Sequence, residues 1–457
     1  MVFGLFLRGR GTSACRCRES FLPWLTIAGL SSAVVVILDI SSSIVDKKGG
    51  SMLNELFGIH SRIVSKVSLN FKRHLYEAIN WDQRMIIITG ARGTGKTTLV
   101  LQHYLERYNN IEKCLYISAD NPLVLKAGIY NTASEYFKYY GDCLIVDEVH
   151  KQKDWSLDIK ALYDAYPDKK FIILGSSTLN ILYEKGDLSR RAILYSLQPL
   201  SFREYLELKH QKQLPKLTFP QILSDHAKIS GELTSQFKTI LGDFNDFLMR
   251  GSYPFFLEFS QNEYFDILSN VLDKIIYEDI STLKSLKSFS SLKLKKLLAF
   301  IALSKIPLFN IESLKVEIGV SKDTLYEYFD LLNRAEIVRI IRTESGSARA
   351  MKNSKILFTS PNIYYSIAFE SWKNDPDKGN IRESFFSSQI GSTYHLFSSM
   401  KTDFVLIDRK TRIEIDVGGK SKGKKQIRNL EDAYVFKDGV EIGFSNSIPL
   451  YLAGFTY

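Results

Sequence analysis

The residues best suited to chemistry form a glycine-rich segment, Gly90-Ala91-Arg92-Gly93-Thr94-Gly95-Lys96-Thr97-Thr98. A short apolar run over 84–89 precedes it and a run of helical spacing over 99–105 follows, which is the context that a phosphate-binding loop requires. Glycines let successive backbone N–H groups turn inward around a phosphate, and the helix N-terminus adds partial positive charge. Lys96 can reach the β- and γ-phosphates, and the Thr97 hydroxyl can bind Mg²⁺. The segment therefore predicts a site for a nucleoside triphosphate with Mg²⁺.

Two carboxylates follow a second apolar run, which covers residues 142–147. Asp147 fits the role of steadying Mg²⁺ through water, and Glu148 fits that of polarising the attacking water. Alone, the pattern is weak, because a solvated strand end looks the same. It lies fifty-one residues after Lys96, in the chain order that a nucleotide-hydrolysing site requires, and this pairing makes it strong.

Four further residues are candidates for sensing or stabilising the γ-phosphate. A third apolar run, 171–174, is followed by Ser176 and Ser177, and a hydroxyl at that strand tip can orient water; we assign the role to Ser176. Arg190 and Arg191 follow, and a guanidinium can stabilise the charge that develops during phosphoryl transfer. A simple turn and a solvated arginine pair are the competing interpretations. An arginine supplied to a neighbouring copy would require an oligomer.

The elements that must position these residues alternate between strands and helices from about 84 to 198. This order predicts an α/β fold whose parallel sheet carries helices on both faces. Ligands of such sheets bind at the carboxyl ends of the strands. All the candidate residues fall at strand ends or just after them, and we expect one nucleotide domain over residues 52–208.

These segments resemble a family of predicted prokaryotic AAA-type P-loop ATPases that carry a C-terminal restriction-endonuclease-like domain of unknown function. The matching segments are GARGTGKTT (90–98), LIVDEVHK (144–151), ILGSS (173–177), LSRR (188–191), LQPLSFREYLEL (197–208), FLMRGSYPFFLE (247–258) and IEIDVGGKSKGKKQI (413–427). The resemblance covers about residues 55–457. It implies ATP as the nucleotide, ATPase roles for Lys96, Thr97, Asp147 and Glu148, and an arginine near nucleotide at 190–191. The purpose of the ATP cycle is poorly defined in this family.

The C-terminal half begins with a helical connecting region, expected over 209–285. Helical spacing then predicts three helices, and a strand pattern follows; the ranges are 292–302, 310–318, 322–332 and 336–342, with Ser321 as the cap of the third helix. This order is typical of a winged helix, expected over 286–345, whose third helix normally enters the DNA major groove. That helix carries Asp323, Glu327 and Asp330, which favour a structural or partner-docking role over DNA contact.

The last segment, 346–457, is expected to be the restriction-endonuclease-like α/β domain. Residues 403–408 and 412–417 predict a hairpin. A metal-dependent nuclease needs carboxylates on adjacent strands and a lysine, for which the candidates are Glu383, Asp403, Asp416 and Lys420. The spacing departs from the usual acidic-x-Lys triplet, since Gly418 stands second after Asp416. We therefore favour binding of nucleic acid or protein over cleavage.

Composition and charge limit the class of protein. The 457 residues are 45% apolar, which excludes a largely disordered chain, and four cysteines are too few for a disulfide-built fold. The net charge of +10 divides into +3 for residues 1–50, −1 for 51–280 and +8 for 281–457. Part of the basic surplus lies in four lysines between 420 and 425, a candidate anion patch.

The first 51 residues differ in composition from the rest. Residues 21–38 carry no charge and follow four arginines, which is typical of a membrane anchor or a cleaved signal peptide. An ordinary amphipathic helix begins at Met52, so a mis-assigned start is the interpretation that we favour. We expect a cytoplasmic protein, bound to a membrane only if residues 21–38 belong to it.

Overall fold

The computed structural model describes residues 50–175, 188, 190–281, 290–304, 311–344, 354–371, 375–408, 411–423 and 425–457. All of them belong to one compact unit, Gly49–Tyr457. No helix among these described residues is long and apolar enough to cross a membrane. The predicted apolar segment 21–38 and the candidates Ser176 and Ser177 lie outside the described residues.

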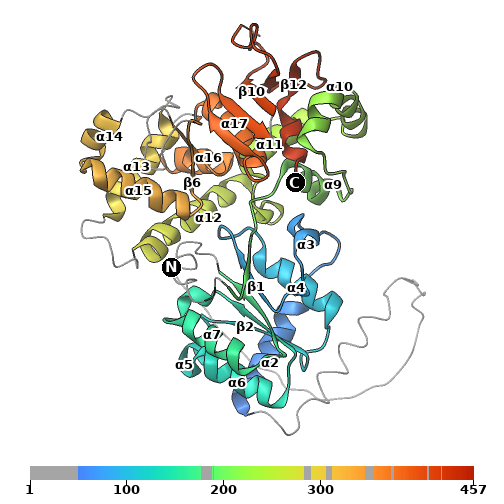
Figure 1. The fold of residues 1–457 in the computed structure, drawn as a ribbon, viewed down its shortest axis with the longest axis vertical. Coiled ribbons are helices and arrows are strands. Elements are labelled where there is room, and N and C mark those ends of the chain that lie inside the picture. Colours follow the sequence, from blue (N-terminus) through green and yellow to red (C-terminus); the bar gives the residue numbers. More distant parts are fainter. Residues whose placement is uncertain are drawn as a thin grey trace, which may run out of the picture. The chain divides into compact units, whose positions relative to one another are not determined.

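A five-stranded parallel sheet forms the first layer, as the alternation of strands and helices predicts (Figure 1). Its strands are β1 (Met85–Thr89), β2 (Cys114–Ser118), β3 (Cys143–Asp147), β4 (Lys170–Leu174) and β5 (Ile193–Ser196), in the order β2-β3-β4-β1-β5. β1 therefore lies between β4 and β5, and the loop that follows it emerges from the interior of the sheet. Figure 1 shows these strands in the blue-to-green part of the chain.

Both faces of this sheet are buried, which explains why its strands read as continuous apolar runs. Along β1, Met85 and Ile87 pack into one hydrophobic cluster, while Ile86 and Ile88 pack into another. Side chains alternate across a strand, so one strand serves two cores. The helices that cover the faces are α2 (Ser51–Val64), α3 (Leu75–Ala78), α4 (Lys96–Arg107), α5 (Pro122–Ala127), α6 (Ile129–Tyr139) and α7 (Trp155–Ala165). The predicted α/β fold with helices on both faces is confirmed for this part of the chain.

Helices dominate the segment that follows. They are α9 (Phe202–His210), α10 (Phe219–Gln236), α11 (Ile240–Arg250), α12 (Gln261–Lys274), α13 (Ser291–Leu303), α14 (Ile311–Ile318), α15 (Lys322–Arg334), α16 (Pro361–Glu370) and α17 (Lys378–Ile390). Shorter turns are the 3₁₀ segments η1 (Val149–Lys151), η3 (Pro254–Leu257) and η5 (Leu450–Phe455) and the π-helical η4 (Ile275–Ile280). The three predicted helices correspond to α13–α15, and the Ser321 hydroxyl accepts from Thr324 N–H as the expected cap of α15.

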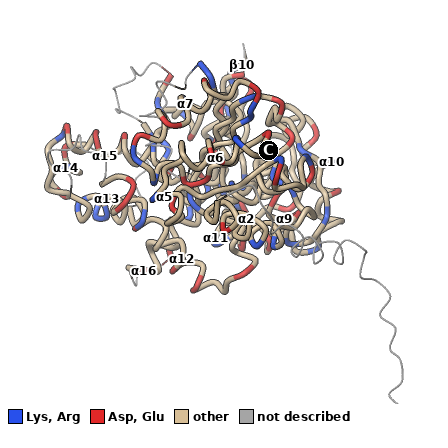
Figure 2. The backbone as a smooth tube through the Cα atoms, turned by 90° about the horizontal axis from the view of Figure 1, so that it is seen from below, with Lys and Arg blue, Asp and Glu red and all other residues tan. Residues whose placement is uncertain are grey.

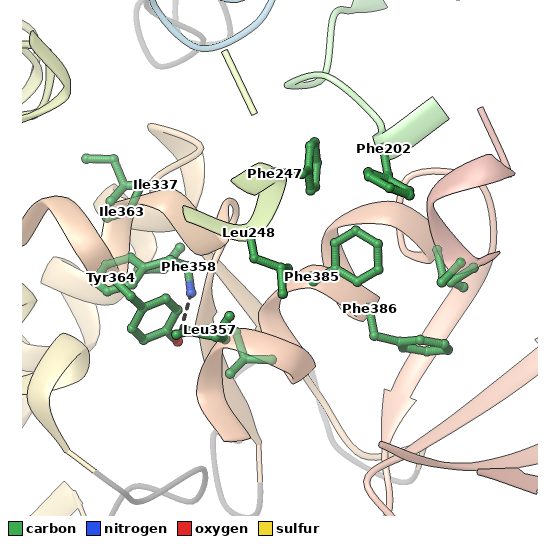
Figure 3. Packing of buried hydrophobic residues seen from close by; sticks show 14 of the residues in the cluster. Phe202, Phe247, Leu248, Ile337, Leu357, Phe358, Ile363, Tyr364, Phe385 and Phe386 are labelled. Atoms are coloured by element: carbon green, nitrogen blue, oxygen red, sulfur yellow. Dashed lines mark hydrogen bonds between the residues drawn. The ribbon is translucent and has the colours of Figure 1, made fainter. Parts of the chain in front are cut away.

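One large hydrophobic cluster joins these helices to the end of the chain. Aromatic rings carry much of it: Phe202 of α9, Phe247 of α11 and Phe385 of α17 lie close together (Figure 3), with the Phe247 and Phe385 ring centroids 5.7 Å apart. The cluster contains Ala91 and then extends from Leu200 to Phe455. The expected boundaries at 285 and 345 therefore divide a stretch of chain that shares one core.

Two sheets complete the C-terminal half. β6 (Val338–Ile341) pairs antiparallel with β7 (Lys355–Phe358), which begins beyond the expected boundary at 345. A second five-stranded sheet has the order β12-β11-β10-β9-β8 and contains β8 (His395–Ser398), β9 (Phe404–Asp408), β10 (Thr411–Gly418), β11 (Ala433–Lys437) and β12 (Ser447–Pro449). The predicted hairpin is present as the antiparallel pair β9–β10, whereas β11 and β12 continue the sheet in parallel.

Charged residues of both signs are interspersed along the described chain (Figure 2). Several basic residues of the C-terminal half are paired; Lys295, for example, lies 2.7 Å from Asp273 and 3.3 Å from Glu370. Such pairs leave the net surplus of +8 over residues 281–457 unchanged, because that count already subtracts the acidic residues of the segment.

Candidate nucleotide site and carboxylate cluster

The loop between β1 and α4 is built around glycines that no other residue can replace without strain. Gly90 has φ +143°, and a Cβ atom added to it would lie 2.3 Å from the Leu197 carbonyl oxygen. Gly95 has φ +93° at the start of α4. Both angles lie in the region that favours glycine. The glycine pattern in the sequence therefore has a local cause in the turn from strand to helix.

Lys96 lies inside this loop rather than in solvent. Its Nζ donates to the carbonyl oxygens of Gly90 at 2.7 Å and Ala91 at 2.9 Å. Burial lowers the pKa of Lys96, against the opposing attraction of Asp147 and Glu148. The ammonium thus lies against two backbone carbonyl groups of the loop, and a phosphate oxygen can compete with them for it.

Thr97 and Asp147 meet although fifty residues separate them in the chain. The Thr97 hydroxyl donates to Asp147 Oδ2 at 2.6 Å, and the Tyr116 hydroxyl donates to the same oxygen at 3.1 Å. The Glu148 N–H donates to Asp147 Oδ1 at 2.7 Å. Burial raises the pKa of Asp147. A hydroxyl and a carboxylate are hard oxygen ligands that suit Mg²⁺, so the pair fits the predicted metal site.

Glu148 leaves the end of β3 in a left-handed conformation, with φ +48°. Its Oε2 lies 3.4 Å from His150 Nε2 and 3.9 Å from Arg92 Nη1. Burial lowers the pKa of His150 to about 4, so this imidazole is neutral at pH 7. Arg92 also pairs with Asp279, and the sequence offered no signal for the contribution of His150 or Asp279.

A buried ion pair, Arg73–Glu204, contacts the phosphate-binding loop. Arg73 donates to Glu204 through Nε at 3.0 Å and Nη2 at 3.2 Å, and its Nη1 donates to the Thr94 carbonyl. Glu204 also accepts from the Ser201 N–H at 3.0 Å, which completes a capping box at the start of α9. The Ser201-x-x-Glu204 spacing is typical of a helix start. The contact of Glu204 with Arg73, 131 residues away in the chain, depends on the tertiary fold.

The arginine candidates lie away from the phosphate-binding loop. Arg191 precedes β5 and pairs with Asp164 near the end of α7, at 3.1 Å. Arg191 precedes β5 and Asp164 precedes β4, so both lie at the amino ends of the strands. Lys96 lies at the opposite, carboxyl edge of the sheet. Arg190 is exposed. The structure therefore does not bring Arg191 to the nucleotide site of its own chain, because β5 enters the sheet from the far edge.

A second group of charges lies between α17 and the C-terminal sheet. Lys355 Nζ lies 2.7 Å from Glu383 Oε2 and 2.9 Å from Asp403 Oδ1, and Lys422 Nζ lies 2.8 Å from Asp416 Oδ1 and 3.5 Å from Asp403 Oδ2. Three predicted nuclease-site carboxylates are thus brought together. Within the described ranges, no group of three or more His, Cys, Asp or Glu side chains is arranged to hold a metal ion. Lys355 and Lys422 pair with these carboxylates instead.

The lysine of this cluster differs from the predicted one. Lys420 is exposed, while Lys422 turns inward to Asp416. The segment leaves β10 at Gly418 and turns back, so the fourth residue after the strand faces the carboxylates and the second faces solvent. The same turn pairs one lysine of the predicted anion patch, Lys422, with Asp416. Lys424 lies outside the described residues.

We predict that Glu383→Gln changes how stability depends on pH. With three carboxylates and two lysines in a buried space, one carboxylate is disfavoured as an anion. Burial raises the pKa of Glu383 to about 7 in spite of Lys355. The folded state therefore holds a proton that the unfolded state loses above its ordinary pKa of about 4.5. The free energy of unfolding of the wild type relative to Glu383→Gln should fall as pH rises from about 4.5 to 7.

Urea unfolding at pH 5 and pH 7.5 measures this difference. Glu431→Gln, an exposed position on the same domain, serves as the control and should show no such trend. The prediction would be contradicted if the free energies of unfolding of wild type and Glu383→Gln differed by the same amount at both pH values.

Comparison with known proteins agrees with the site. A family model described as an AAA domain matches residues 82–206, and one described as a domain of unknown function (DUF8612) matches 241–371. The chain is 28% identical over 420 residues to the uncharacterized protein MJ1637 of Methanocaldococcus jannaschii, covering 83% of this chain and 87% of the relative.

Similar solved structures include AMPPCP-bound DnaA from Aquifex aeolicus, at 15% identity and a TM-score of 0.23, covering 61% of this chain and 88% of that one. A DNA polymerase III gamma subunit-related protein from Thermotoga maritima has 15% identity and a TM-score of 0.22, with 62% and 84% covered. Both halves of the nucleotide site, the loop around Lys96 and the carboxylates after β3, lie within residues 82–206, which match the AAA domain model.

Proposed function

We propose that this protein is a Mg²⁺-dependent AAA-type ATPase. The observation that carries the proposal is the contact between the Thr97 hydroxyl and Asp147 beside a buried Lys96 in a glycine loop. These residues come from two separate motifs, and their meeting supports a single site for a triphosphate and its metal ion.

The residues have distinct chemical tasks in this proposal. The backbone N–H groups of the loop and the Lys96 ammonium bind the phosphate oxygens, and Lys96 exchanges its bonds to Gly90 and Ala91 for them. Thr97 and Asp147 would hold Mg²⁺, which when bound supplies charge neutralisation between the phosphates. Glu148 accepts a hydrogen bond from the attacking water and draws its proton. Arg190, being exposed, is available to the site of a neighbouring copy in an oligomer.

We further propose that the ATP cycle moves the C-terminal half, with a winged helix around α13–α15 and a restriction-endonuclease-like domain over 346–457. Its partner is DNA or another protein, and the cytoplasm is its compartment. The alternative is a nucleotide-gated binding module with little turnover. An ATP-gated nuclease is less favoured, because Lys355 and Lys422 already neutralise the carboxylates that would bind its metal.

ATP turnover by the full chain tests the proposal, with Lys96→Ala as the comparison. The wild type should hydrolyse ATP with Mg²⁺ present and lose this activity when EDTA removes the metal. Lys96→Ala should bind a fluorescent ATP analogue at least about tenfold more weakly, because loss of a charge-assisted contact costs about 1.5–3 kcal/mol. Turnover by the wild type no faster than by Lys96→Ala, with or without DNA, would refute the ATPase.

A further inference from the structure

The phosphate-binding loop has an ionic contact with the C-terminal half of the chain. Asp279 lies on η4, a π-helical turn, and its side chain is 3% exposed. Its carboxylate accepts from Arg92 of the loop at two points, Nη2 to Oδ1 at 3.0 Å and Nε to Oδ2 at 3.3 Å. Two-point pairs of this kind fix the orientation of the guanidinium as well as its position.

The same guanidinium faces Glu148. Arg92 Nη1 lies 3.9 Å from Glu148 Oε2, and Arg92 Nη2 lies 3.4 Å from His150 Nε2, which is itself 3.4 Å from Glu148 Oε2. The His150 ring thus lies beside both charges, with its Nε2 3.4 Å from each side chain. Arg92 is shared between a carboxylate that belongs to the AAA domain and one that belongs to the C-terminal half.

The loop has a second contact with that half, at the neighbouring residue. A Cβ atom added to Gly93 would lie 3.0 Å from Phe255 Cε1, and one added to Gly95 would lie 3.8 Å from Pro254. η3 thus packs on the loop beside the Arg92–Asp279 pair. A movement of the loop on phosphate binding would therefore disturb both the Arg92–Asp279 pair and the packing of η3.

Because Arg92 contacts both Asp279 and Glu148, the pair with Asp279 determines how strongly Arg92 attracts Glu148. A guanidinium pulled toward Asp279 leaves Glu148 able to accept a hydrogen bond from water. Without Asp279, Arg92 is free to close the 3.9 Å gap to Glu148 Oε2 and donate to it, and an oxygen occupied by a guanidinium no longer accepts from the attacking water. The strength of the Arg92–Asp279 contact therefore bears directly on the base of the proposed reaction.

We propose that Asp279 is a positioning residue that couples the C-terminal half to ATP hydrolysis through Arg92. This rests on the proposed ATPase function. Displacement of η4 shifts Arg92 onto Glu148 and slows hydrolysis. Where displacement of η4 also changes nucleotide affinity, bound nucleotide changes by the same factor how firmly η4 is held. A partner that moves the C-terminal half thereby regulates turnover without touching the nucleotide.

Asp279→Asn tests the coupling, and Glu278→Gln is its matched control. Glu278 is the preceding residue of η4 and pairs at the surface with Lys151, Nζ to Oε2 at 2.7 Å. Asp279→Asn should lower ATP turnover by no more than the about 10²–10⁴-fold that a positioned general base contributes, with a smaller change in nucleotide affinity. Glu278→Gln should match the wild type in both measurements.

Hydrogen–deuterium exchange of the wild-type peptide covering 275–281 gives a readout that needs no hydrolysis. Addition of a non-hydrolysable ATP analogue should change its exchange, and Asp279→Asn should lose that response. Wild-type turnover equal to that of Glu148→Gln, together with an exchange response, would refute the ATPase and retain only a coupling of η4 to nucleotide binding. Normal turnover by Asp279→Asn, or analogue binding without an exchange response in the wild type, would overturn the coupling.

Discussion

Glu148→Gln is expected to lower ATP turnover by about 10²–10⁴-fold, the usual contribution of a positioned general base. Glu148 stands at the end of β3, one residue after Asp147, which forms the Thr97 contact. Glutamine keeps the size of the side chain and can accept a hydrogen bond, but it cannot take the proton of the attacking water. The phosphate loop and the metal ligands are left intact, so nucleotide binding should be retained.

Steady-state turnover and binding of a fluorescent ATP analogue, measured on the same preparations, separate the two effects. Glu55→Gln, on the exposed side of α2, is the matched control and should behave as the wild type. A Glu148→Gln variant that turns over within a few-fold of wild type would remove Glu148 from the reaction. A variant that neither binds nor turns over would show that the substitution disrupts the site as a whole.

Glu204→Ala is expected to have the largest effect on stability. Arg73 and Glu204 are 5% and 0% exposed, so removal of the carboxylate leaves a buried guanidinium without its main partner. Breaking a buried pair in this way costs about 3–5 kcal/mol. Glu106→Gln removes one partner of the surface pair with Lys72, Nζ to Oε1 at 2.5 Å, and should cost about 1 kcal/mol or less.

The Arg73–Glu204 pair also predicts a dependence on pH. Burial alone would raise the pKa of Glu204, but Arg73 and His74 outweigh it and hold the pKa well below its ordinary value. A carboxyl with a depressed pKa stabilises the fold above its ordinary pKa of about 4.5, and that stability is lost as pH falls through the folded value.

Urea unfolding of wild type, Glu204→Ala and Glu106→Gln at pH 7 and pH 4 measures both effects. The difference between wild type and Glu204→Ala should shrink at the lower pH. Equal losses for Glu204→Ala and Glu106→Gln would show that the buried pair contributes no more than a surface one. Because Arg73 also donates to the Thr94 carbonyl, Glu204→Ala should weaken nucleotide binding as well.

Local pattern was enough to predict the nucleotide domain. The spacing of glycines, Lys96 and Thr97 reflects a turn whose φ angles only glycine adopts without strain, and continuous apolar runs reflect strands buried on both faces. The helices α13–α15 and the hairpin β9–β10 were likewise predicted, because their caps and periodicities are properties of neighbouring residues. Such features depend on short stretches of chain, and a sequence records them directly.

The tertiary structure alone decided which distant side chains meet. Asp279 reaches Arg92, and Arg73 reaches Glu204, across separations of 187 and 131 residues that no local pattern encodes. The same limit explains two placements that the sequence did not predict: the direction in which β5 enters its sheet puts Arg191 at the edge opposite to the nucleotide loop of its own chain, and the turn after β10 brings Lys422 rather than Lys420 to Asp416. Residue type and spacing therefore determined the chemistry available at the loop, while the packing of the C-terminal half determined which charges surround it, because contacts between remote segments depend on the fold as a whole.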